Sequence, residues 1–295
     1  IVVAAIVGFA GIAPVLAAIE CGCDIALANK EALVAAGKVV MDAVKSARVQ
    51  LLPVDSEHSA IFQALTNSTT KEIKKIILTA SGGSLRGMPK EEVSCATVRQ
   101  VLNHPTWNMG AKVTVDSASL MNKALELIEA HWLFNVDADK LDAIIHPQSI
   151  VHGMVEFCDG SVIAQLSTPD MHLPIQYALT WPSRVTGSSG SIDWSGLQSL
   201  NFEQIDSAVF PAIGLAYEVI ERGGTSGAIL NGANEVVVDA FLQDGLPFGA
   251  MVGIVKEVLG NLVITDCDDM DTLVAADEES RAMARKIIAS YKVNS

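Results

Sequence analysis

The sequence predicts an α/β protein in which a parallel sheet comes first, an antiparallel hairpin follows, and a bundle of helices ends the chain. Three observations support this: apolar strand-like segments alternate with a helical segment near the start, Ser149 to Ser167 alternates apolar and polar residues, and only helical patterns follow residue 206. Strands joined by helices form parallel sheets. With 295 residues, half of them hydrophobic, the chain is long enough for two or three domains.

The first 19 residues, IVVAAIVGFAGIAPVLAAI, carry no charge, as a membrane span or signal peptide would. Gly8, Gly11 and Pro14 interrupt them and no basic segment precedes them, so we predict buried structure instead. The pattern predicts strands over residues 1–7 and 25–28 and a helix over residues 14–21, with a further apolar stretch over residues 49–54. The chain starts without Met inside this pattern, so we expect residues 1–53 to be the end of a longer domain.

The predicted elements then change in character. Residues 74–84 predict a strand that runs into a Gly-rich loop, and residues 112–134 predict a short strand followed by a helix from Ser117. Asp159-Gly160 lies at the centre of the alternating segment, which predicts an antiparallel hairpin. The Ser- and Gly-rich residues 186–196 predict a linker, and helices are predicted over residues 208–222, 226–243, 249–259 and 271–291.

The composition limits the possible functions. A formal net charge of -14 argues against a nucleic-acid-binding protein, which would carry clustered Lys and Arg. An anionic substrate would therefore need a local positive group or a metal ion. Five cysteines without a C-x-x-C pair fit reduced thiols in an intracellular protein.

Two carboxylates in PVDSEHSAIFQAL, Asp55 and Glu57, are the first candidate site. In extended backbone their side chains would point to one side, and paired carboxylate oxygens suit Mg²⁺ or Mn²⁺. The alternative is a helix start, with Asp55 or Ser56 as the cap and Glu57 in the first turn. His58, which directly follows Glu57, is interpreted as incidental to the site.

A predicted helix over residues 117–132 offers a third carboxylate. Ser119, Asn122, Lys123 and Glu126 are three or four residues apart and so share one face, opposite an apolar set that includes Leu127. A solvated helix face is the alternative, although Asn and Ser are poor choices for one.

Four further features leave both a functional and a structural interpretation open. Ser81-Gly82-Gly83 after a strand fits an oxyanion loop or a tight turn, and Lys30 lies either at a ligand-binding sheet edge or on the surface. The loop from His104 to Gly110, with Trp107, has the composition of a mobile lid, or of a loop anchored in the core. The other histidines lack zinc spacing, and most of them are predicted to be structural; they are His131, His146, His152 and His172.

Several long motifs occur here in one order: LANKEALV, PVDSEHSAIFQ, TASGGS, HPTWNMGAKVTVDSASLMNKALELIEAHWLF, IHPQSIVHGMVEFCDGSVIAQLSTPDM and LNGANEV. Together they resemble the 1-deoxy-D-xylulose 5-phosphate reductoisomerase family of the non-mevalonate isoprenoid pathway, in an N-terminally truncated chain. The resemblance implies an enzyme that uses NADPH and a divalent metal, Mg²⁺ or Mn²⁺, to convert 1-deoxy-D-xylulose 5-phosphate to 2-C-methyl-D-erythritol 4-phosphate. It also implies a homodimer in the bacterial cytoplasm or the plastid stroma, with no nucleic-acid or membrane partner.

The resemblance also implies a division of the chain and of its site residues. Residues 1–53 would be the C-terminal part of a Rossmann-type NADPH-binding domain, residues 54–182 a catalytic α/β domain with a lid loop near 103–111, residues 183–205 a linker and residues 206–295 a helical domain. The metal ligands would be Asp55, Glu57 and Glu126, and the catalytic residues Lys30, Glu57, His104 and Trp107. The substrate-binding residues would be Lys30, Ser56, Glu57, Ser81, His104, Ser117, Asn122, Lys123 and Glu126, and the cofactor-binding residues Asn29, Glu31, Gly110 and Met171.

Two other functions stay open at this point. The chain contains no G-x-G-x-x-G turn, so it could be a non-enzymatic remnant that binds sugar phosphate or dimerises without turnover. A metal-dependent phosphosugar aldolase would use the same carboxylates without a nicotinamide cofactor.

Overall fold

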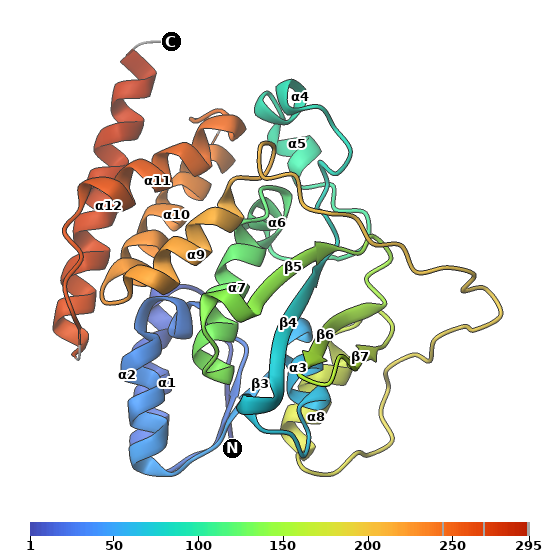
Figure 1. Cartoon of the computed structure of the whole chain (residues 1–295). Helices are drawn as coiled ribbons and strands as arrows, with labels where there is room; N and C mark the ends of the chain where they lie inside the picture. Colours follow the sequence, from blue (N-terminus) through green and yellow to red (C-terminus); the bar gives the residue numbers. More distant parts are fainter. Residues whose placement is uncertain (244, 268, 294–295) are drawn as a thin grey trace.

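The computed structural model describes residues 1–243, 245–267 and 269–293 and shows an α/β protein with two sheets and a C-terminal group of helices (Figure 1). The predicted fold class is confirmed. None of the helices in the described ranges is both long enough and apolar enough to cross a membrane. The uncharged first 19 residues instead form a strand, a short 3₁₀ turn and a helix.

The first sheet is parallel, with the order β1 (Val2–Ala4), β2 (Ile25–Leu27) and β3 (Leu51–Pro53). Helices α1 (Ile12–Glu20) and α2 (Glu31–Ala47) join these strands, after the 3₁₀ turn η1 (Phe9–Gly11). The central strand β2 is buried throughout, which explains its apolar sequence. Parallel strands present their carboxyl ends at one edge of the sheet, so the segments that follow β2 and β3 lie side by side there.

The second sheet has the order β5 (Leu141–Ile145), β4 (Ile73–Ala80), β6 (Val151–Phe157) and β7 (Val162–Leu166). Strands β4 and β5 are parallel, whereas β6 and β7 form the predicted antiparallel hairpin. Helix α7 (Met121–Phe134) packs on β4 and β5, and α3 (Ser56–Ala64) packs on β6 and β7. The remaining elements of this region are η2 (Thr70–Glu72), α4 (Lys90–Ser94), α5 (Val98–Val101), η3 (Ala138–Lys140) and α8 (His172–Thr180).

The strand predicted at residues 112–115 is wrong, because this segment is the helix α6 (Ala111–Ala118). The alternating valines suggested a strand, but Lys112 and Asp116 form an ion pair of 3.0 Å one helical turn apart, and the helix buries Val115 and Ala118 in the core. Leu120 adopts a left-handed conformation, with φ at 57°, and separates α6 from α7. The predicted single helix from Ser117 is therefore two helices.

After α8 the chain runs through residues 181–211 without a helix or strand element, and Figure 1 shows this segment projecting from the molecule. Four helices follow, as predicted: α9 (Ala212–Arg222), α10 (Ser226–Leu242), α11 (Met251–Asn261) and α12 (Met270–Val293), with the 3₁₀ turn η4 (Phe248–Ala250) before α11. Helix α10 also packs on α2, where a side chain at Gly227 would lie 1.9 Å from the carbonyl oxygen of Val34. One continuous core joins these helices to α7 and to the second sheet.

Candidate active site

A cavity of about 360 Å³ lies where the two sheets, α3, α6 and α7 meet, and we call it the central cavity. Most residues that the sequence predicts for the site line it: Lys30, Asp55, Ser56, Glu57, Ser81, Trp107, Ser117, Asn122, Lys123, Glu126 and Met171. Four predicted residues do not: Asn29, Glu31, His104 and Gly110.

Asp55 and Glu57 lie at the start of α3, so the extended backbone expected for them is wrong and the helix-start interpretation is right. Asp55 is the N-cap residue, but its side chain makes no capping hydrogen bond; it contacts the Lys30 ammonium at 2.7 Å instead. Because α3 begins beside α7, one carboxylate oxygen from each of Asp55, Glu57 and Glu126 lies within 4.8 Å of the others. The three predicted metal ligands therefore converge, despite the different backbone.

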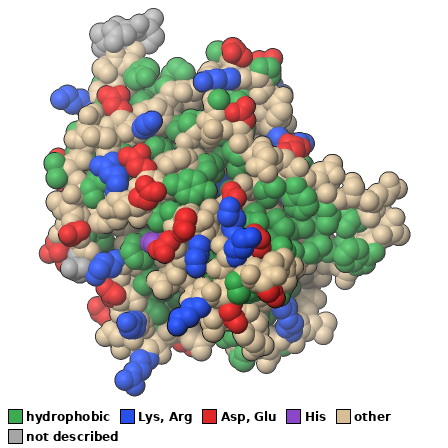
Figure 2. All heavy atoms as spheres, viewed as in Figure 1, with side chains coloured by type: hydrophobic (Ala, Val, Ile, Leu, Met, Phe, Trp, Pro, Cys, Tyr) green, Lys and Arg blue, Asp and Glu red, His purple; other side chains and the backbone are tan. Residues whose placement is uncertain are grey.

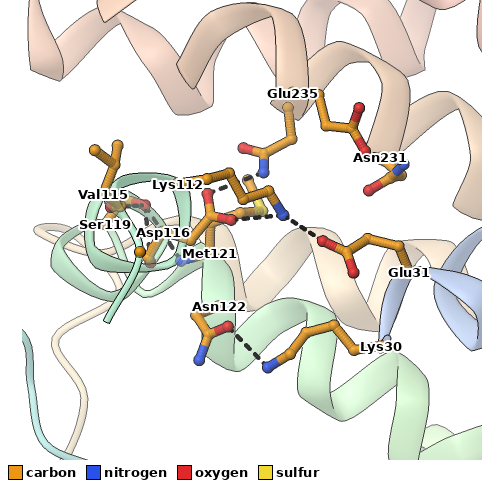
Figure 3. Close-up of polar contacts among 12 residues, drawn as sticks. Lys30, Glu31, Lys112, Val115, Asp116, Ser119, Met121, Asn122, Asn231 and Glu235 are labelled. Carbon is orange, nitrogen blue, oxygen red and sulfur yellow. Dashed lines mark hydrogen bonds and ion pairs between the residues drawn. The ribbon is translucent and has the colours of Figure 1, made fainter. Parts of the chain in front are cut away.

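Two lysines offset most of the negative charge of these three carboxylates. Lys30 Nζ lies 2.8 Å from Asn122 Oδ1 and 3.1 Å from Glu126 Oε1, and Figure 3 shows the first of these contacts between α2 and α7. Lys123 Nζ lies 2.7 Å from Glu57 Oε1 and also pairs with Glu126. The solvated-face interpretation of α7 is wrong, since the side chains of Lys123 and Glu126 are only 3% and 1% exposed.

Ser119 does not share the polar face of α7. It lies in the connection between α6 and α7, where its hydroxyl donates to the carbonyl oxygens of Val115 and Asp116. The left-handed Leu120 that ends α6 is the reason for this difference.

Burial and neighbouring charge change the acidity of these groups in opposite directions. Burial, with the nearby Glu57 carboxylate, raises the pKa of the Glu126 carboxyl to about 7 against the opposing effect of the two lysines. Burial alone would raise the pKa of Asp55 as well, but the Lys30 charge outweighs it and holds that pKa well below its usual range. The site thus holds a strongly acidic carboxylate beside one that titrates near neutrality.

The Ser81-Gly82-Gly83 loop closes one side of the central cavity. Gly82 and Gly83 both have positive φ, and a side chain at Gly83 would lie 2.6 Å from the carbonyl oxygen of Ser117. The glycines therefore allow a tight turn that brings the loop against the end of α6, so the tight-turn interpretation is right, and the oxyanion loop stays a prediction. Ser81 and Ser117 become neighbours of Asn122 and Lys123 on the same cavity.

The predicted lid loop lies between α5 and α6. His104 does not line the central cavity; its Nε2 lies 2.9 Å from Ser81 Oγ, and its Nδ1 accepts the backbone N–H groups of Thr106 and Trp107 at 3.1 and 2.9 Å. Partial burial lowers the pKa of this imidazole. Trp107 is half-buried and packs edge-on against His152, with ring centroids 6.2 Å apart.

His152 is the residue that the sequence interpretation missed. It was among the histidines interpreted as mostly structural, but it lies on β6, is 3% exposed and lines the central cavity. Its Nε2 has no hydrogen-bond partner among the described residues. The only signal in the sequence was a histidine inside an apolar strand pattern, which more often means a satisfied core residue.

Two of the residues predicted for cofactor binding, Asn29 and Glu31, connect the segment after β2 to neighbouring elements. Asn29 Nδ2 donates to the carbonyl oxygen of Gly8 at 3.1 Å, and Asn29 Oδ1 accepts from the N–H of Ala32 at 2.8 Å. Glu31 accepts from Lys112 at 2.8 Å, and Figure 3 shows Lys112 between Glu31 and Asp116. Gly110 is the N-cap residue of α6, so only Met171 of the four reaches the central cavity.

Comparison with known proteins identifies the family. The profile of 1-deoxy-D-xylulose 5-phosphate reductoisomerase matches residues 1–37, and profiles of the C-terminal domains of this enzyme match residues 51–134 and 166–283. The reductoisomerase of Pelotomaculum thermopropionicum is 51% identical over 98% of this chain and 74% of its own length. The enzyme of Chlorobium limicola is 50% identical over 97% of this chain and 75% of its own length.

Solved structures agree with this result. A DOX-P reductoisomerase in complex with NADPH, fosmidomycin and magnesium superposes with a TM-score of 0.94 at 39% identity, over 98% of this chain and 76% of that one. The Zymomonas mobilis enzyme in complex with NADPH gives a TM-score of 0.92 at 42% identity, over 97% of this chain and 74% of that one. The resemblance inferred from the motifs is confirmed: the chain belongs to the 1-deoxy-D-xylulose 5-phosphate reductoisomerase family.

Proposed function

We propose that the protein converts 1-deoxy-D-xylulose 5-phosphate to 2-C-methyl-D-erythritol 4-phosphate with NADPH and a divalent cation, as a step of isoprenoid biosynthesis. The observation that carries this proposal is the convergence of three carboxylates from two segments, together with two lysines, inside one cavity. Related structures that contain NADPH and magnesium support it.

The residues present fit a divalent cation. Asp55, Glu57 and Glu126 supply only carboxylate oxygens, which Mg²⁺ and Mn²⁺ prefer, and their spacing allows all three to reach one ion. When bound, the cation would polarise the carbonyl and hydroxyl oxygens of the substrate and so lower the barrier to rearrangement of its carbon skeleton.

The other cavity residues bind and orient an anionic substrate. Lys30 and Lys123 bring positive charge to the cavity, and Ser81, Ser117 and Asn122 on its lining offer hydrogen-bond donors, which together suit a phosphate group. Lys30 and Ser56 lie beside the carboxylates, where they would contact the reacting oxygens. His104 and Trp107 belong to the lid loop that would exclude water when it closes.

The cofactor and the division into domains are part of the same proposal. Asn29, Glu31, Gly110 and Met171 would lie near the NADPH, at the carboxyl edge of the parallel sheet where α/β folds bind such ligands. Residues 1–53 would belong to the NADPH-binding domain, residues 54–182 to the catalytic domain, residues 183–205 to the linker and residues 206–295 to the helical domain.

A homodimer is also proposed. Strand β7 is an edge of its sheet, and Val162 and Ile163 on it are 54% and 47% exposed. Figure 2 shows apolar side chains gathered at the base of the projecting segment, which itself exposes Val185 and Trp194. A second copy of the chain would cover both the strand edge and these side chains.

The test measures NADPH oxidation, as the loss of NADPH absorbance, in the presence of 1-deoxy-D-xylulose 5-phosphate and Mg²⁺. We expect turnover that requires the metal and falls sharply in Glu126→Gln but not in Glu156→Gln, a control that removes a partly exposed carboxylate, the ion-pair partner of Lys74. Substrate binding without NADPH oxidation would favour the non-enzymatic alternative. Cleavage of the sugar phosphate without NADPH would favour the aldolase.

A further inference from the structure

His58 lies between the two helices that supply the metal ligands. It is fully buried on α3, one residue after Glu57, and three of its contacts reach α7. Its Nε2 lies 2.9 Å from the carbonyl oxygen of Glu126, its Nδ1 lies 3.5 Å from Glu129 Oε2, and its ring stacks on Phe134 with centroids 6.3 Å apart. The ring thus connects the α3 half of the carboxylate group to the α7 half.

The geometry determines where the hydrogen atoms lie. A carbonyl oxygen only accepts hydrogen bonds, so Nε2 of His58 carries a hydrogen and donates it to Glu126. Nδ1 of His58 and Oε2 of Glu129 face each other, and neither has a hydrogen-bond partner in the described part of the chain. Both side chains are at least 99% buried, so water does not solvate them, and two bare lone pairs would repel each other. One hydrogen between these two atoms resolves the conflict, whichever of them carries it.

We propose that Glu129 is a positioning residue for the metal site. Its hydrogen bond to Nδ1 fixes the rotation of the His58 ring, and the ring in turn holds the backbone of Glu126 at a constant distance from Asp55 and Glu57. Residues that orient metal ligands through such a bond commonly change metal affinity by 10 to 100-fold when they are replaced. This inference rests on the proposed metal site, but Glu129 itself is not one of the proposed ligands.

A second cation is the competing explanation for the same atoms. Asp55, His58 and Glu129 each offer a ligand atom within 4.8 Å of the others, and Nδ1 of His58 lies 3.8 Å from Asp55 Oδ2. Asp55 is already one of the three ligands proposed for the first cation, so a second cation here would have to share it. A hydrogen bond between His58 and Glu129 needs only one of the two unpartnered atoms to be protonated, and the structure therefore favours it.

The test compares Mn²⁺ affinity, measured by electron paramagnetic resonance, among variants of Glu129. Glu129→Gln keeps a side chain of the same length that can donate to or accept from Nδ1, so we expect an affinity within about threefold of the wild type. Glu129→Leu cannot make the bond, so we expect an affinity about 10 to 100-fold weaker. Should Glu129→Leu fail to fold, Glu129→Asp, which is too short to reach Nδ1, carries the same expectation.

Leu127→Ala is the matched control, because Leu127 is a fully buried core residue of the same helix. We expect it to lower the melting temperature and leave Mn²⁺ affinity unchanged. Unchanged affinity in Glu129→Leu, or equal losses in the Gln and Leu variants, would overturn the proposal, as would a second Mn²⁺ per chain that Glu129→Gln removes. A wild-type chain that binds no Mn²⁺ would instead contradict the metal site of the proposed function, and with it this inference.

Discussion

Replacing Glu126 by Gln should separate metal binding from folding. The Glu126 carboxylate is 1% exposed and would contribute one of three ligand charges to the cation. Truncating one partner of a buried charge pair costs roughly 2–5 kcal/mol of binding free energy. Since about 1.4 kcal/mol is tenfold in an equilibrium constant, Mn²⁺ affinity should fall at least about 30-fold. Lys30 and Lys123 keep Asp55 and Glu57 as partners at 2.7 Å each, so neither ammonium is left unpaired.

The pH dependence gives a second measure of the same residue. The pKa of the Glu126 carboxyl, about 7 without a cation, means that Mn²⁺ must displace a proton below neutrality. Affinity in the wild type should therefore drop about tenfold per pH unit below that pKa and level off above it. In Glu126→Gln this slope should disappear.

Without a cation, the ionised Glu126 carboxylate lowers the stability of the fold, whereas it strengthens metal binding. A carboxyl whose pKa is raised on folding stabilises the folded state below its unfolded pKa, and this contribution is lost as the pH rises through the folded value of about 7. The cation-free Glu126→Gln variant should thus be at least as stable as the wild type at pH 8, with an upper limit of about 3 kcal/mol for the gain. Urea unfolding with chelator measures it. Unchanged Mn²⁺ affinity, or a large loss of stability without the cation, would refute the reasoning.

Three further outcomes are expected from the rest of the site. The pKa of His104 is lowered, so the folded state binds fewer protons there than the unfolded chain, and we expect the wild-type lid loop to lose order, followed by Trp fluorescence, as the pH falls below about 6.5. His104→Asn should keep the turn at Thr106 and Trp107, because the Asn oxygen can accept the same N–H groups, but should abolish this pH dependence. Gly83→Ala should destabilise the chain by about 1–3 kcal/mol in urea unfolding, because φ is positive there and the added carbon would meet the carbonyl of Ser117; an unchanged midpoint would contradict the close approach. Ser117→Ala should weaken binding of inorganic phosphate about three- to tenfold, the worth of one hydrogen bond, without changing the melting temperature, and equal phosphate affinity would remove Ser117 from the phosphate site.

The sequence predicted elements whose pattern reflects burial on one or both faces. The buried strand at Ile25–Leu27 and the hairpin of β6 and β7 were correct for this reason. The strand prediction for residues 112–115 failed because two alternating valines favour a strand locally. The ion pair between Lys112 and Asp116 and the core contacts of Val115 favour a helix instead. Such tertiary contacts are not visible in a short window of sequence.

The carboxylate site shows a second limit of prediction. The convergence of Asp55, Glu57 and Glu126 was expected from residue types, but from the wrong backbone, since both a helix start and an extended segment can present two nearby carboxylates. His58 and His152 were assigned no role, because a histidine in an apolar segment gives no sign of which groups face it. Contacts with residues far away in the sequence determine both the convergence of the carboxylates and the surroundings of the two histidines.

The paired lysines explain how an acidic chain can hold a site for an anionic substrate. Three carboxylates packed together in the interior would repel one another, and Lys30 and Lys123 offset that repulsion without any ion. With the carboxylates ionised, these five groups carry one excess negative charge, and a dication would turn it into one excess positive charge, which attracts a phosphate. The site would then bind substrate well only after the cation, so Glu126, which must lose its proton to admit that cation, would couple the order of binding to pH.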